Sequence, residues 1–171
     1  MKKIFSTVSI LIIAVLLAGG AALLPVSNVA AMSNSQVDVD RGLTKAYNVE
    51  LQWLSKQETA IEKANQAGNK VQDLIDKGAA AGFDVSGLQS TLDTFQGEMV
   101  TVQSYHQQAA DVLSAHNGFD GSGNITDRSA ARQTVIDARR ALGEAHMTMA
   151  QASWVLRDAV YEWKNINFPQ E

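Results

Sequence analysis

The sequence predicts an all-α fold, a long three-helix antiparallel bundle with a coiled-coil-like, alanine-rich seam, which follows an N-terminal signal peptide. Three observations lead to this prediction. Alanine recurs at every seventh position near the C-terminus, two glycine-containing breaks separate three stretches of helical periodicity, and the first 31 residues are largely apolar after a positive start. The length of 171 residues suits one domain, predicted over 39–165, and the hydrophobic fraction of 46% is typical of a globular chain.

The segment 127–164 has the clearest periodicity. Small and large apolar residues alternate in it at steps of four and three, which is the 3.5-residue period of a helical seam held for about five heptads. The small residues are Ala131, Ala138, Ala145, Ala152 and Ala159, and the large ones are Val135, Leu142, Met149, Leu156 and Trp163. Because alanine lets a neighbouring helix approach closely, we predict one long helix packed lengthwise in the bundle. Trp154 falls outside this seam, so it either covers a third side of the bundle or is exposed.

Two further helices are predicted over 39–81 and 87–116, with a flexible N-terminus over 32–38 and a tail over 166–171. The seam of the second helix consists of Leu88, Leu92, Phe95, Met99, Val102, His106, Ala109 and Leu113, and its next position is His116. Two positions expected to face the core are therefore histidines.

The first helix has a weaker seam. Its apolar face consists of Leu43, Tyr47, Leu54, Ile61, Ala64, Val71 and Ile75. The same face contains Glu50, Gln57 and Gly68, which interrupt it. Glycine costs a helix interior about 1 kcal/mol relative to alanine, so Gly68 marks either a bend or a point of close helix contact.

The breaks between the helices contain capping residues. Gly82 is predicted to take the left-handed conformation that ends a helix, and Ser86 with Gln89 three residues later predicts a capping box at the start of the second helix. Thr126 or Asp127 is predicted to cap the last helix by accepting from its free amides.

The first helix is expected to outrun the second by about fourteen residues, at ~1.5 Å of rise per residue. The candidate interaction surface at this overhang consists of Leu43, Tyr47, Leu51, Trp53 and Phe119. Two alternatives follow for this overhang. Either the second loop folds against it through Phe119 and Ile125, or a partner covers it.

The N-terminal segment predicts export. Lys2 and Lys3 precede an apolar run over 4–24, and Val29-Ala30-Ala31 matches the small-residue site of a signal peptidase. We predict a signal peptide over 1–31, cleaved after Ala31, and a secreted or extracytoplasmic location in the periplasm or at the cell surface. The alternative is an uncleaved anchor, the one case in which a membrane is expected as a partner.

Charge and cysteine content exclude several classes of function. Removing residues 1–31 leaves 14 − 2 = 12 basic against 18 acidic residues, a net charge of −6, without a basic block that could follow a phosphate backbone. Nucleic acid is therefore not an expected partner. The chain has no cysteine, which excludes disulfides, lipoprotein anchoring and thiolate metal sites.

Histidines in the predicted seams define a candidate divalent-metal or haem site. Matching levels along the helices predicts His106 near Glu62 and Asp137, and His146 near Met99. A histidine beside a carboxylate can bind a divalent metal, and a Met/His pair can ligate haem. Because paired ligands at metal spacing are missing from the sequence, seam histidines bonded to a neighbouring acid or to water are the favoured interpretation.

The second loop resembles part of a calcium loop. Asp120, Ser122, Asn124 and Asp127 could provide oxygen ligands for weakly bound Ca²⁺. The acid of the first position and the glutamate of the twelfth position are missing, since Gly118 and Ser129 stand there. A glycine-rich hairpin followed by a helix cap is therefore the favoured interpretation.

The helix-flanking patterns resemble those of exported all-helical bacterial proteins. They are Gly-Phe-Asp-Val-Ser at 82–86, and His-x-Gly-Phe-Asp-x-x-Gly-Asn-Ile-Thr-Asp at 116–127 with Ala-Arg-x-Thr-Val at 131–135. This resemblance covers most of the chain beyond the predicted signal peptide, and it implies the helical fold without a catalytic activity. A looser similarity to small periplasmic helical stress and metal-responsive proteins rests on size, export and helicity. Residues 61–71 faintly resemble periplasmic four-helix b-type cytochromes, whose ligand positions at the chain ends have no counterpart here.

The sequence therefore predicts a non-enzymatic binding protein. It contains no nucleophile elbow, no phosphate-binding glycine loop and no cysteine nucleophile. The leading hypothesis is protein–protein or surface interaction in the cell envelope, with another envelope or secreted protein, or a second copy, as partner. The alternative is a metal or haem carrier that uses His106, His146 and Met99.

Overall fold

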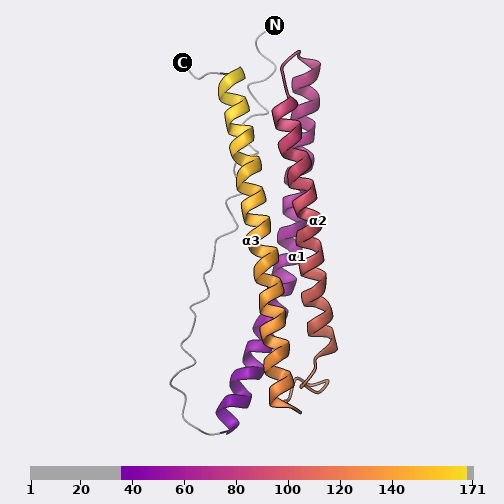
Figure 1. Cartoon of the computed structure of the whole chain (residues 1–171), viewed down its shortest axis with the longest axis vertical. Helices are drawn as coiled ribbons and strands as arrows, with labels where there is room; N and C mark the ends of the chain where they lie inside the picture. The colour runs from indigo at the N-terminus through magenta and orange to yellow at the C-terminus, as the bar shows by residue number, and fades with distance from the viewer. Residues whose placement is uncertain (1–35, 169–171) are drawn as a thin grey trace. The chain divides into compact units, whose positions relative to one another are not determined.

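The computed structural model describes residues 36–168, and the regular structure in this range is helical. The helices are α1 (Gln36–Ala80), α2 (Ser86–Ala115) and α3 (Arg128–Asn167) (Figure 1). The prediction of an all-α fold with three helices is confirmed. The predicted signal peptide over 1–31 lies outside the described residues. Residues 32–35 of the predicted flexible N-terminus and 169–171 of the predicted tail also lie outside them.

The chain divides into two compact units, and each takes one segment from every helix. The turn unit contains residues 60–101 and the described residues from 147 onward, which include the connection between α1 and α2. The loop unit contains residues 36–59 and 102–146, which include the connection between α2 and α3.

The predicted seam of α3 is buried along nearly its whole length. Its five large residues are buried, as are Ala131, Ala138, Ala145 and Ala152. At the fifth repeat Ala159 is only half-buried, and the next residue, Val160, is buried instead. An α-helix drifts by about 20° per heptad from a 3.5-residue repeat. After four heptads the drift approaches the angle of one residue, which explains the change from Ala159 to Val160.

In the turn unit, Gly68 is a point of close contact. A Cβ atom at this position would lie 3.0 Å from Cε1 of Phe95, while α1 continues through it as an unbroken helix. Of the two alternatives for Gly68, the structure has the close helix contact. A second contact between the same helices joins the side chains of Gln72 and Gln89, at 3.5 Å.

Two capping predictions concern the connection between α1 and α2, and the structure has the one for Gly82 but not the one for Ser86. Gly82 has a φ of 83°, the left-handed conformation expected of a C-cap. The capping box is wrong, because Ser86 does not accept from the helix. Its N–H and hydroxyl both donate to Oδ1 of Asp84, at 2.9 and 2.7 Å, and Gln89 donates to Asp93 instead of reaching back. These bonds hold the pKa of Asp84 below its usual value.

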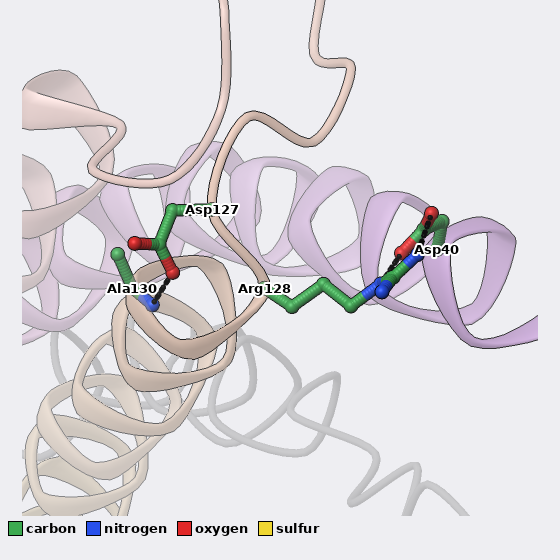
Figure 2. A network of polar contacts seen from close by, with 4 residues as sticks. All are labelled: Asp40, Asp127, Arg128 and Ala130. Atoms are coloured by element: carbon green, nitrogen blue, oxygen red, sulfur yellow. Dashed lines mark hydrogen bonds and ion pairs between the residues drawn. The ribbon is translucent and has the colours of Figure 1, made fainter. Parts of the chain in front are cut away.

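The connection between α2 and α3 begins at His116, which has a positive φ of 37° and an exposed side chain. Its Nδ1 lies 2.7 Å from the carbonyl oxygen of Ser114. The expectation that His116 faces the core is wrong, because α2 ends at Ala115 and the left-handed residue turns the chain away from the seam. Asp127, rather than Thr126, caps α3, since its Oδ1 accepts from the N–H of Ala130 at 3.0 Å (Figure 2).

Candidate interaction surface

The overhang of α1 is covered by the second loop. The ring of Tyr47 stacks on that of Phe119 with a centroid distance of 4.4 Å, and both residues are buried in the core of the loop unit. The hydroxyl of Tyr47 donates to the carbonyl of Leu113 at 2.9 Å. Ile125 packs against the same cluster. Of the two alternatives for the overhang, the structure therefore has the folded-back loop.

This arrangement changes the role of the residues expected at the interaction surface. Tyr47 and Phe119 are core residues, so neither side chain is available to a partner in this fold. Leu43 and Trp53 are partly buried and pack against the core clusters of the loop unit. Leu51 alone of the five is exposed, at 38%. Tyr47 and Phe119 therefore make with each other the aromatic contact that a partner would otherwise have made.

Polar contacts at the surface hold the loop against α1. Arg128, the first residue of α3, donates to both carboxylate oxygens of Asp40 at 2.6 and 2.9 Å (Figure 2). The hydroxyl of Thr44 donates to the carbonyl of Gly123 at 3.2 Å. The guanidinium of Arg128 holds the pKa of the Asp40 carboxyl below its usual value.

Glu50, the first polar interruption of the α1 seam, is completely buried. Its Oε1 accepts from Nε of Arg139 on α3 at 2.8 Å, and it lies 2.7 Å from Nη2 in the same ion pair. Its Oε2 has no hydrogen-bond partner within the described part of the chain. Glu50 therefore depends on one guanidinium whose own side chain is 58% exposed.

Gln57, the second interruption, joins all three helix segments of the loop unit. Its Nε2 donates to the carbonyl of Leu142 at 2.9 Å, and its Oε1 lies 3.1 Å from Nδ1 of His106. His106 was predicted near Glu62 and Asp137, and its Nδ1 contacts the amide of Gln57. Since a buried amide must find partners, His106 has a structural role here.

The other expected metal or haem ligands have different surroundings in the two units. His146 is half-buried in the loop unit, with its ring centroid 6.4 Å from that of Trp53, whereas Met99 is buried in the turn unit. Residues 36–168 contain no group of three or more His, Cys, Asp or Glu side chains that could hold a metal ion. The alternative function as a metal or haem carrier therefore stays a prediction.

Asp120 uses its carboxylate to build the second loop. Oδ1 accepts from the N–H groups of Ser122 and Asn124, both at 2.8 Å, and Oδ2 accepts from the side chain of Asn124 at 3.0 Å. The hydrogen bonds from these donors hold the pKa of Asp120 below its usual value, and the bond from the Asn124 side chain has the largest effect. The two carboxylates proposed as calcium ligands, Asp120 and Asp127, are thus engaged in a turn and in a helix cap.

Calcium is expected to leave the thermal stability of the protein unchanged, because binding it would break the bonds that Asp120 makes within its own turn. Thermal melting in excess Ca²⁺ and in excess chelator measures this. A higher melting temperature with Ca²⁺ that is lost in Asp120→Asn would show that the loop binds calcium.

Because the pKa of Asp120 is lowered in the folded state, the stability that its carboxylate contributes is present at neutral pH. This stability is lost only as the pH falls through the pKa of Asp120 in the folded state.

An exposed apolar row runs along α3 within the turn unit. Met147, Trp154 and Tyr161 are seven residues apart and are 68%, 66% and 63% exposed. We call these three residues the outer row. Each stands two positions after a seam alanine, which places the row opposite the buried seam on a helix with a 3.5-residue period. Arg157 lies 5.9 Å above the ring of Trp154.

The outer row is the feature that sequence reasoning missed. Only Trp154 of the three had a predicted position, either covering a third side of the bundle or exposed. In the structure it is exposed. The signal that could have found the row is its seven-residue spacing in the sequence, which is the same as the spacing of the buried seam. The same position earlier in the helix holds Gln133 and Arg140, the polar residues usual there.

The chain matches no protein-family model, no curated protein and no solved structure. Within residues 36–168, no helix has the length and apolar character that crossing a membrane requires. The fold and surface therefore define the class of protein only as a helical bundle with an exposed apolar row.

Proposed function

We propose that this protein is a non-enzymatic helical-bundle protein of the cell envelope or the secreted fraction, and that it binds a protein partner, either a different protein or a second copy, through the outer row. The observation that supports the proposal is the exposure of Met147, Trp154 and Tyr161 at the helix position farthest from the buried seam. Solvent-facing helix positions are normally polar, and Trp and Tyr are enriched among residues that dominate binding energy. Export rests on the positive, apolar and small-residue pattern of residues 1–31.

We also propose that the helix segments within each unit run antiparallel between α1 and α2. In the turn unit, Gly68 faces Phe95 and the later Gln72 contacts the earlier Gln89. In the loop unit, Tyr47 contacts Leu113 and the later Gln57 contacts the earlier His106. Contacts whose numbers rise on one helix and fall on the other support this direction.

A photo-crosslinking side chain in place of Trp154 is expected to capture a discrete protein in the cells that produce the chain, since the outer row would lie in the interface. Val100 is a matched control position, because it is 66% exposed and lies on α2, whereas the row lies on α3. Adducts are separated by mass and identified by peptide sequencing. The proposal is wrong if Trp154 and Val100 give the same adducts, or none.

The triple variant Met147→Ser, Trp154→Ser and Tyr161→Ser provides the loss-of-binding arm of the same test. Exposed positions usually change stability by less than about 0.5 kcal/mol each, so its helicity should resemble that of the unchanged protein. A crosslinker at the neighbouring exposed Val155 should then lose its adduct. An adduct that persists in the triple variant would place the interface elsewhere.

A further inference from the structure

We propose that the partner of the outer row is a second copy of this chain, with the two rows packed on one another about a two-fold axis. This inference rests on the proposed function and names its partner. Apolar residues at a strict seven-residue spacing form the pattern through which one helix packs along another. The outer row itself is a helix surface with that spacing. A surface that meets its own copy about a two-fold axis must be self-complementary, and the flanking residues allow this to be examined.

The residues beside Trp154 avoid like-charge contacts in either direction of pairing. Ala150 and Arg157 flank it on one side, and Gln151 and Asp158 flank it on the other. In an antiparallel pair centred on Trp154, the same flank of each copy meets. Arg157 then faces the partner's Ala150, and Asp158 faces the partner's Gln151. In a parallel pair the opposite flanks meet, and Arg157 faces the partner's Asp158.

The apolar contact with the partner copy therefore costs no charge repulsion near its centre. Arg157 and Asp158 already pair within each chain, with Nη2 2.9 Å from Oδ1. Antiparallel pairing adds an amide donor beside each acid, and parallel pairing adds a second carboxylate beside each guanidinium. Like charges placed opposite one another across an interface cost several kcal/mol, and this surface avoids that cost in both directions.

The exposed area indicates how strong the dimer should be. A fully buried aromatic side chain covers roughly 150–250 Å², so Trp154 and Tyr161, each about two-thirds exposed, have on the order of 100–150 Å² left to cover. The four aromatic side chains across the two-fold axis remove roughly 400–600 Å², and the two Met147 side chains add to this area. Stable complexes bury about 1,200 Å² or more. With the flanking residues added, the pair approaches this limit, so we expect a reversible dimer with a dissociation constant in the micromolar range or weaker.

Sedimentation velocity over a range of concentrations tests the inference on the protein purified from its producing cells. The unchanged protein and Val100→Glu are expected to show the same monomer–dimer equilibrium. Trp154→Glu places two carboxylates near the two-fold axis and is expected to weaken the dimer at least tenfold. A protein that stays monomeric into the upper micromolar range overturns the inference, as does a dimer that Trp154→Glu leaves unchanged.

A single cysteine gives a second measurement, because the natural chain has none and every disulfide must then join two chains. Trp154→Cys is expected to form a disulfide-linked dimer under mild oxidation, whereas Val100→Cys is not. Equal dimer yields at the two positions contradict the two-fold pairing. The crosslinking test separates the two proposals. Trp154 adducts with a different protein alone would overturn self-pairing and leave the proposed function intact, whereas the absence of any Trp154 adduct would overturn both.

Discussion

Gly118→Ala is expected to destabilise the loop unit by roughly 3 kcal/mol or more, because the added methyl group has no space. Gly118 has a φ of 83°, and a Cβ atom there would meet the backbone nitrogen of Ala131 and lie 2.5 Å from the carbonyl oxygen of Asp127. Backbone atoms of the first turn of α3 cannot move aside as a flexible side chain could. Urea unfolding followed by circular dichroism measures the loss.

Two other glycines of the same loop provide graded controls. Gly123 also has a positive φ, 80°, but nothing lies within 4 Å of its Cβ position, so Gly123→Ala should cost only about 1–2 kcal/mol of left-handed strain. Gly121 has open space and no positive φ, so Gly121→Ala should be nearly neutral. Equal losses for all three variants would mean that strain at Gly118 and contact with α3 are not the cause.

Arg139→Met is expected to destabilise the loop unit by about 3 kcal/mol, because it leaves the buried carboxylate of Glu50 without its ion partner. Glu50 has no exposed surface, and its side-chain hydrogen bond and its ion pair both come from this one guanidinium. The removal of one member of a buried pair costs far more than the pair contributes. The free energy of unfolding in urea is again the measurement.

The double variant Glu50→Met and Arg139→Met should recover most of that loss, since replacing a buried ion pair by apolar residues is often neutral or stabilising. Arg140→Met is the matched control. Arg140 is the next residue of α3 and makes a 3.9 Å exposed pair with Asp137, which should contribute less than about 1 kcal/mol. A double variant as unstable as Arg139→Met alone would mean that the guanidinium acts through something other than Glu50.

The seam of α3 could be predicted almost residue by residue, because a seven-residue repeat is a local property of the chain. Glu50 and Gln57 appeared only as weaknesses of the first seam, since no local pattern shows that Arg139 and His106 will lie beside them. For the same reason the capping box at Ser86 was predicted from spacing alone, and the carboxylate of Asp84 competed for the serine hydroxyl.

The sequence by itself determined the three helices, the heptad seam and Gly82 as a helix end. Each of these depends on residue spacing or on a single backbone conformation, and both are set over a few residues. Only the tertiary structure decided that Phe119 would cover Tyr47, that Arg139 would pair with Glu50, and that Trp154 would stay uncovered. These outcomes depend on the rotation and level of helices that are distant in sequence, since Glu50 and Arg139, for example, lie 89 positions apart. A small change in either would exchange one neighbour for another.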